Sequence, residues 1–170
     1  EEDIKECART FTGWTVANTE YMQKRVNNDS LWPYGRLNLH FEYRSDDHDD
    51  GEVSFLGETG RFSGDEITEI ICKQPATARF ISRHLYNFFV ADEPPVPQWP
   101  FIPPRDPAAI ESLSEMYFDS GYDLRSMLRL IFTSNFFKAE DSRFAKIKSP
   151  VDMVVGVLRL TGEFTEPHPE

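Results

Sequence analysis

The chain has 170 residues, a length that fits one domain and typically buries about 70% of the surface that the unfolded chain exposes. Hydrophobic residues make up 39% of it and aromatic residues 14%, enough apolar area for a packed core, which excludes a disordered chain. The formal net charge is −11, so the chain repels phosphate backbones and anionic lipid, and we expect no nucleic-acid partner.

The first third of the chain predicts one helix and one β-hairpin. Apolar residues at helical spacing begin at the N-terminus, and Gly13 ends this helix. Residues 17–34 are polar and irregular, with a short helix expected at 19–26. From 37 to 43 apolar and polar residues alternate as in a half-buried strand, and 53–56 reads as the returning strand. An isolated hairpin is marginal in water, so we expect it to pack on helices.

Capping residues mark the starts of the helices that follow. Ser63 and Glu66 form a capping box, in which each side chain accepts a hydrogen bond from the backbone N–H of the other residue. Pro75 suits the first position of the next helix. That helix places a set of large side chains on one face, which we expect to be its apolar face: Phe80, Ile81, His84, Leu85 and Phe88. Later starts are expected at Asp106–Pro107, Asp123 and Ser149–Pro150, and Gly162 closes the last helix.

Residues 92–107, the proline-rich segment, contain seven prolines and predict an extended connection in place of a helix. Trp99 and Phe101 within it indicate that it packs on the body of the protein. Residues 163–170 predict a flexible tail. The sequence therefore predicts a single, mainly α-helical domain over residues 1–170, bundle-like, with one small β-hairpin and a proline-rich extended segment.

Cys7 and Cys72 are the only cysteines, and no Cys-x-x-Cys occurs, so ligand count excludes a thiolate zinc site. Their spacing leaves both a disulfide and two buried thiols open, and we favour thiols. No apolar run is long enough to span a membrane. The sequence begins without Met or a signal peptide, already in helical pattern, and we interpret the chain as the C-terminal part of a longer protein.

One stretch gathers potential metal ligands. Residues 45–52, the acidic turn, place His48 among four aspartates. Carboxylates suit Ca²⁺, Mg²⁺ or Mn²⁺, and an imidazole shifts the preference towards transition metals such as Zn²⁺. The candidate ligands are His48, Asp49 and Asp50, with His40 expected across the hairpin from the turn. The alternative is a solvated turn whose aspartates bond their own backbone, and we favour that alternative.

Other signals favour structural roles. A true EF-hand is excluded, because its twelfth position falls on Gly57 where a Glu is required. Arg79 and Arg83 lie one helical turn apart and could contact an anion, but pairing with acidic neighbours is the favoured alternative. His84, on the expected apolar face of the same helix, is more simply a core histidine. No Gly-x-Ser-x-Gly pattern, nucleophile–base pair or cofactor fingerprint is present.

Several strings, in this order and spacing, are distinctive in combination: Phe11-Thr12-Gly13-Trp14, His48-Asp49-Asp50-Gly51 with Phe55-Leu56-Gly57, Gln74-Pro75-Ala76-Thr77-Ala78-Arg79-Phe80-Ile81, Ser120-Gly121-Tyr122-Asp123-Leu124-Arg125 and Lys148-Ser149-Pro150-Val151. They resemble a large uncharacterised bacterial family, catalogued as domain of unknown function 1800, across nearly the whole chain. Many members are longer and look exported, so the resemblance implies a location outside the cytoplasm. Many are encoded beside a sulfatase-like family, which the resemblance suggests as a partner.

The family often has a Lys soon after the His-Asp turn, and Glu52-Val53-Ser54 has none here. We expect a non-enzymatic interaction or scaffold module acting with a partner protein, because the acidic surface and aromatic-rich proline-rich segment suit docking. The alternative is a metal-dependent, hydrolytic enzyme that uses His48, Asp49 and Asp50.

Overall fold

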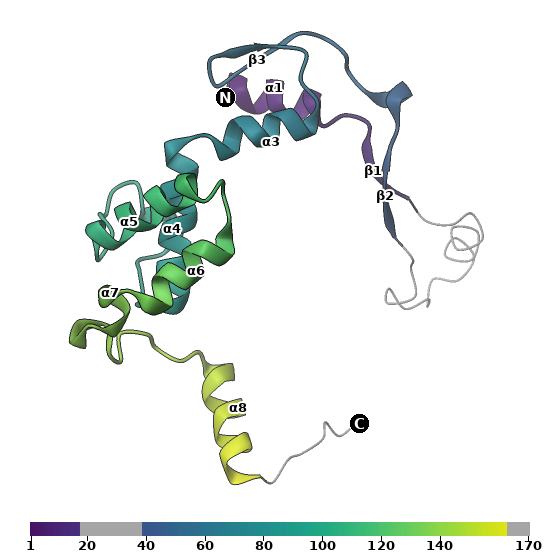
Figure 1. The fold of residues 1–170 in the computed structure, drawn as a ribbon. Helices are drawn as coiled ribbons and strands as arrows, with labels where there is room; N and C mark the ends of the chain where they lie inside the picture. Colours follow the sequence, from purple (N-terminus) through teal and green to yellow (C-terminus); the bar gives the residue numbers. More distant parts are fainter. Residues whose placement is uncertain (18–38, 163–170) are drawn as a thin grey trace. The chain divides into compact units, whose positions relative to one another are not determined.

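The computed structural model describes residues 1–17 and 39–162, and Figure 1 draws their helices and strands. They fall into two compact units, Glu1–Cys72 and Lys73–Glu170, which we describe separately. The fold is mainly α-helical with two small antiparallel strand pairs among the described residues, so the predicted fold class is confirmed. That both units belong to one domain stays a prediction. The short helix expected at 19–26 and the tail at 163–170 lie outside the described residues.

The N-terminal unit packs a helix against a short strand and a second helix. In it, α1 (Glu2–Thr10) contacts both β3 (Val53–Phe55) and α3 (Gly64–Cys72), and Figure 1 shows α1 and α3 side by side. Cys7 and Cys72 are both thiols. The core of this unit is small: Phe55, Ile67 and Ile70 are buried, with Cys7, Phe11, Phe62 and Ile71 packed around them.

The strands of this unit pair differently from the sequence-based expectation. β1 (Trp14–Ala17) pairs with β2 (His40–Tyr43), and β3 pairs with β4 (Glu58–Gly60), both antiparallel. The hairpin predicted between 37–43 and 53–56 is therefore wrong, although both segments contain strands. Leu56 and Gly57 explain the change. Both have positive φ, 49° and 88°, as a two-residue type I′ turn requires, so the chain returns at once along β3.

The C-terminal unit is a cluster of helices. α4 (Pro75–Phe89), α5 (Pro107–Asp119) and α6 (Leu124–Thr133) pack on one another, followed by α7 (Asn135–Lys138) and the 3-10 turn η4 (Glu140–Ser142) (Figure 1). Burying a large aliphatic side chain contributes about 1.5–3 kcal/mol, so this core stabilises the unit. Its buried residues are Ala78, Tyr86, Val90, Ala91, Ala109, Ile110, Leu113, Tyr117, Met127 and Ile131.

The buried face of α4 overlaps the expected apolar face only in part: Ile81 and Leu85 pack against the core as expected. Phe80 and Phe88, from the expected apolar face, are 50% and 69% exposed, whereas Ala78, Ser82 and Tyr86 are buried. α5 packs closely on this side of α4, where Ser82 supplies a small side chain. There the hydroxyl of Ser82 lies 3.3 Å from that of Ser114.

The predicted helix starts are confirmed by their hydrogen bonds. The Ser63 N–H donates to Glu66 Oε2 at 2.8 Å, and the Glu66 N–H donates to Ser63 Oγ at 3.4 Å. Asp106 and Asp123 cap α5 and α6 with their side chains. α8 (Pro150–Thr161) starts at a full capping box and ends at Gly162 in the left-handed conformation. No helix in the described part of the chain is both long and apolar enough to cross a bilayer.

A buried ion pair organises the proline-rich segment, whose short 3-10 turn is η3 (Val96–Gln98). The Arg83 side chain is 7% exposed and that of Glu93 is 0% exposed. Nε and Nη2 of Arg83 donate to Glu93 Oε2 at 2.9 and 2.6 Å, and the guanidinium lies 4.7 Å from the centre of the Trp99 ring. Arg83 thus has the acidic partner expected of a structural arginine. It also donates to three backbone carbonyls of the segment, those of Trp99, Ile102 and Pro103.

Candidate functional site

The acidic turn connects β2 to β3 and begins with the 3-10 turn η2 (Ser45–Asp47). It is not the tip of a hairpin, because its flanking strands pair elsewhere. The His48 side chain is 10% exposed, with the Tyr43 ring against it at 5.7 Å between centroids. The side chain of Asp50 is 85% exposed. The turn therefore combines a largely buried imidazole with a carboxylate in solvent.

The hydrogen bond of His48 fixes which ring nitrogen carries the proton. Nδ1 lies 2.9 Å from the backbone carbonyl oxygen of Thr12. A carbonyl only accepts, so Nδ1 donates, and in the neutral ring Nε2 holds the lone pair. Nε2 lies 3.8 Å from Asp50 Oδ1. An imidazole held in this way offers Nε2 as a metal ligand, a hydrogen-bond acceptor or a base.

Thr12 holds the turn with its side chain as well. Its hydroxyl donates to the carbonyl of Arg9 at 2.6 Å and accepts from the backbone N–H of Asp49 at 2.8 Å. Thr12, two residues after the end of α1, therefore contacts two consecutive residues of a turn that is remote in sequence. This pairing fixes the position of His48 relative to the end of α1.

Arg9, near the C-terminal end of α1, binds the acidic turn through Asp49. Its Nε donates to Asp49 Oδ2 at 2.9 Å and its Nη2 to Oδ1 at 3.3 Å. The Gly51 N–H donates to Oδ1 at 2.9 Å. The hydrogen bond from Arg9, and then that from Gly51, lowers the pKa of Asp49 to about 2. The same bond to Asp49, followed by one to Glu6, raises the pKa of Arg9.

Gly51 leaves the space in which Arg9 and Asp49 meet, and a side chain there would displace the Arg9 guanidinium. A Cβ at this position would collide with Nη2 of Arg9 and would lie 2.8 Å from Asp49 Oδ1. Both carboxylate oxygens of Asp49 already accept hydrogen bonds, so Asp49 holds the acidic turn in place. Of the candidate ligands His48, Asp49 and Asp50, the carboxylate of Asp50 and the Nε2 atom of His48 are the groups left to meet a ligand.

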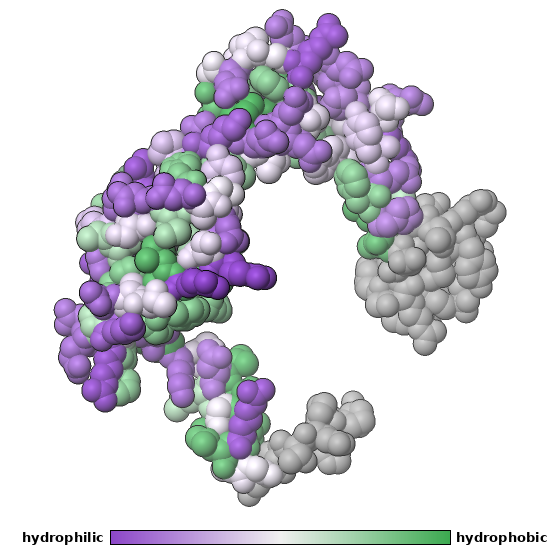
Figure 2. All heavy atoms as spheres, in the orientation of Figure 1, coloured by the Kyte–Doolittle hydropathy of each residue, from purple (hydrophilic) through white to green (hydrophobic). Residues whose placement is uncertain are grey.

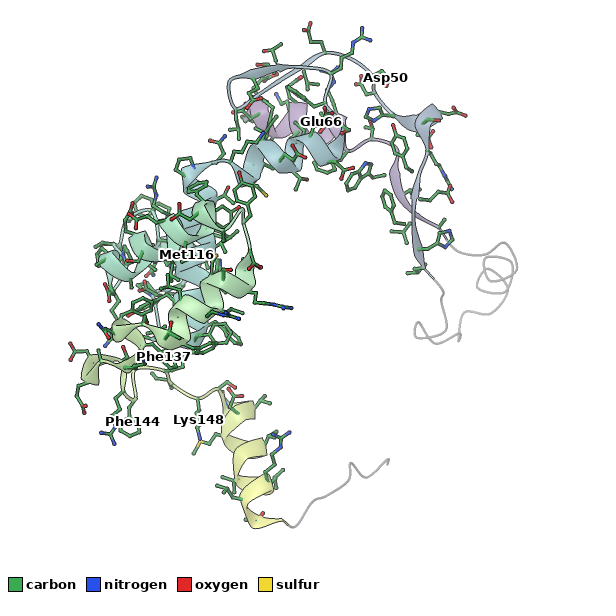
Figure 3. The ribbon with its side chains drawn as sticks, in the orientation of Figure 1. Asp50, Glu66, Met116, Phe137, Phe144 and Lys148 are labelled. Atoms are coloured by element: carbon green, nitrogen blue, oxygen red, sulfur yellow. The ribbon has the colours of Figure 1, made fainter. Side chains whose placement is uncertain are left out.

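A small surface pocket of about 190 Å³ lies beside the imidazole. Its Glu66 belongs to the capping box of α3, where hydrogen bonds from the N–H and then the hydroxyl of Ser63 lower its pKa. Asp50 and Glu66 are labelled in Figure 3 and come from the acidic turn and from α3. The pocket is lined by His48, Asp49, Asp50, Gly51, Arg61, Phe62, Ser63 and Glu66.

Three of the four candidate ligands, His48, Asp49 and Asp50, are consecutive residues and lie together in the acidic turn. His40 lies opposite Ala17 at the far end of β2 from the turn, so its expected position across a hairpin is wrong. Within residues 1–17 and 39–162, no group of three or more His, Cys, Asp or Glu side chains is arranged to hold a metal ion. Metal binding at the turn stays a prediction.

Sequence reasoning missed Arg9 and Thr12. Thr12 belongs to one of the distinctive strings, but nothing in that string connects it to a histidine 36 residues away. Arg9 pairs with an aspartate 40 residues away, a contact with no local signal. Arg9 supplies a cation at this turn, and its Nη1 lies 3.5 Å from the carbonyl oxygen of Glu52.

A second candidate surface is apolar and lies at residues 144–161, the C-terminal apolar segment. Phe144, Ile147 and Leu160 are 90%, 79% and 89% exposed, and α8 has no buried residue. Hydrophobic residues stand on the visible surface of α8 in Figure 2. The start of the segment is anchored, because Asp92 accepts from the backbone N–H of Ile147 at 2.7 Å and pairs with Lys146.

Comparison with known proteins agrees with the resemblance drawn from the sequence. A family model described as "Protein of unknown function (DUF1800)" matches residues 1–169. No curated protein and no solved structure matches the chain. The match spans essentially the whole sequence, including the acidic turn and α8. The chain therefore belongs to the DUF1800 family of proteins of unknown function.

Proposed function

We propose that the chain is a non-enzymatic interaction module that docks a partner protein through α8. The observation that carries this proposal is that α8 has 12 residues, largely apolar, of which none is buried. A helix of this length is marginal in water without packing. Gly156 in its interior and its several valines lower its intrinsic stability further. The capping box defines where α8 starts, and a partner surface would supply the burial that the helix lacks.

The partner we propose is the sulfatase-like protein that many family members have as a genomic neighbour, and the site of action is outside the cytoplasm. Both points rest on the family. The chemistry of α8 fits a protein partner, because exposed apolar side chains at helical spacing suit a hydrophobic groove.

The test is a binding measurement between the purified full chain and the purified sulfatase-like neighbour. Val151→Asp/Val154→Asp should abolish binding, because it places two charges on apolar positions that are 69% and 58% exposed. Phe88→Asp is the matched control, since Phe88 is 69% exposed on α4 and should bind as wild type does. Hydrogen exchange adds a second readout, in which amides 153–161 become protected only with the partner. Equal binding by the double variant, or no binding by the wild-type chain, would reject the proposal.

A metal-dependent hydrolytic activity is the second candidate, favoured by the fixed Nε2 atom of His48 beside Asp50 at the small pocket. Here His48 and Asp50 would hold a divalent cation, with Asp49 and Arg9 positioning the turn. Ca²⁺, Mg²⁺, Mn²⁺ and Zn²⁺ are tested separately by melting shift and by metal analysis after dialysis. His48→Ala should remove any stoichiometric metal, whereas His84→Ala, a change at a histidine on α4, should retain it. No bound metal and no melting shift would exclude this candidate.

A further inference from the structure

A shallow groove of about 420 Å³ lies between α5 and α6. Met116, labelled in Figure 3, comes from α5 and is half-buried, as is Leu130 of α6. These two side chains provide an apolar floor, and polar side chains of α6 surround it. The groove is lined by Met116, Arg125, Ser126, Arg129, Leu130 and Thr133.

The free polar groups of the groove are two guanidinium groups. Arg125 and Arg129 are four residues apart on α6, so both lie on the same face of the helix. Within the described residues, neither side chain forms an ion pair or a hydrogen bond. The two hydroxyls are occupied, because Ser126 donates to Asp123 Oδ2 at 2.6 Å and Thr133 donates to the carbonyl of Arg129 at 2.8 Å. The groove therefore presents hydrogen-bond donors and positive charge above an apolar floor.

The acid nearest in sequence, Asp123, forms no ion pair with either guanidinium in the described part of the chain, although its pKa is lowered by hydrogen bonds from Ser126 and Arg125 and, to a lesser extent, by the charge of Arg125. Asp123, the N-cap of α6, accepts from the backbone N–H groups of Arg125 and Ser126 and from the Ser126 hydroxyl. Its carboxylate is thus engaged in capping. The chain has 29 acidic residues and 18 Lys and Arg, so carboxylates are in excess. Despite this excess, the two arginines, one helical turn apart, form no ion pair within the described residues.

We propose that this groove binds a short acidic peptide segment of a partner protein, with two carboxylates on Arg125 and Arg129 and an apolar side chain over Met116 and Leu130. The planar guanidinium fork matches a carboxylate in a bidentate manner. The net charge of −11 disfavours a long polyanion such as a nucleic acid. A short segment meets only the local charge, because salt screens charges further away than about 8–10 Å. The proposal uses none of the residues of α8 and stands independently of it.

The experiment uses the full chain and a fluorescein-labelled acetyl-Glu-Glu-Phe-Glu-Glu amide, followed by fluorescence anisotropy. Arg125→Gln/Arg129→Gln should weaken binding by about fivefold or more, since two exposed charge pairs are lost. Arg79→Gln is the control, because Arg79 is an exposed arginine on α4 that forms no ion pair within the described residues. Wild-type affinity at about 150 mM NaCl should also fall when NaCl is raised to about 500 mM.

A peptide with Gln in place of every Glu separates charge recognition from hydrophobic adhesion, and the proposal expects it to bind at least about fivefold more weakly. Equal binding of the two peptides would overturn the proposal. So would equal affinity of the double variant and wild type, or no binding of the acidic peptide to the wild-type chain. Unchanged melting temperatures of the variants would show that any loss is not caused by unfolding.

Discussion

Removing the guanidinium of Arg83 should destabilise the C-terminal unit by about 3–5 kcal/mol, the usual penalty for breaking a buried ion pair. Arg83→Met keeps the aliphatic part of the side chain but leaves the Glu93 carboxylate, which is 0% exposed, without its cation. Among the residues that the structure describes, the one remaining donor to Glu93 is the backbone N–H of Arg105, at 2.7 Å. Three carbonyls of the proline-rich segment also lose their donor, although water can replace it near the surface.

The double variant Arg83→Met/Glu93→Gln separates the buried charge from the lost packing. Gln removes the charge, and its amide oxygen can still accept from the Arg105 N–H. We therefore expect the double variant to be more stable than Arg83→Met alone, with a coupling free energy of about 1–3 kcal/mol.

Urea unfolding followed by Trp99 fluorescence measures these differences, in a Trp14→Phe/Trp32→Phe background that leaves Trp99 as the reporter. A loss of 3–5 kcal/mol corresponds to a fall in Tm of roughly 12–40 °C for a unit of this size. Arg79→Met, an exposed position on the same helix, should change stability by less than about 0.5 kcal/mol. The reasoning fails if Arg83→Met costs less than about 1 kcal/mol, or if the double variant is the least stable.

Three further outcomes are expected. The ion pair of Asp49 with Arg9 lowers the pKa of Asp49 to about 2, so it stabilises the N-terminal unit above about pH 4, and this contribution disappears as the pH falls towards 2. Acid unfolding of Asp49→Asn should lack that part of the pH dependence, and an unchanged curve would contradict the assignment. Gly51→Ala should raise the pKa of Asp49, measured by NMR titration of its carboxyl carbon, because the new Cβ collides with Arg9. Ser149→Ala should reduce helix stability by about 1 kcal/mol through loss of the cap, measured as faster amide exchange in α8 with its partner bound.

Local sequence signals predicted the helix starts well, because capping is a contact between residues three apart. Ser63 with Glu66, and Ser149 with Asp152, form the expected hydrogen bonds. Strand pairing is a non-local contact, and the alternation at 37–43 indicates a strand without indicating its partner. Leu56-Gly57 was the missed signal, since a two-residue turn there pairs β3 with the segment directly after it.

In the candidate site, too, the local signal was visible in the sequence and the non-local contacts were not. The unusual composition of the acidic turn drew attention to His48, but the groups that orient it come from the end of α1, 36 to 40 residues earlier. The buried face of α4 was missed in part for a related reason. The spacing placed Phe80 and Phe88 on one stripe with Ile81 and Leu85. Only the packing of the neighbouring helices shows that the buried side is turned towards Ala78, Ser82 and Tyr86.

The contacts of Arg83 have a consequence for proteolysis. From residue 84 to residue 104 the chain contains no Lys or Arg, so trypsin releases this stretch only by cutting after Arg83 and after Arg105. The bond after Arg83 lies inside α4, and its side chain is 7% exposed and held by Glu93. Trypsin must bind that side chain in an extended backbone, so cleavage requires α4 to unwind and the ion pair to open. The rate at which the peptide His84–Arg105 appears in a limited digest therefore reports how often the centre of the C-terminal unit opens.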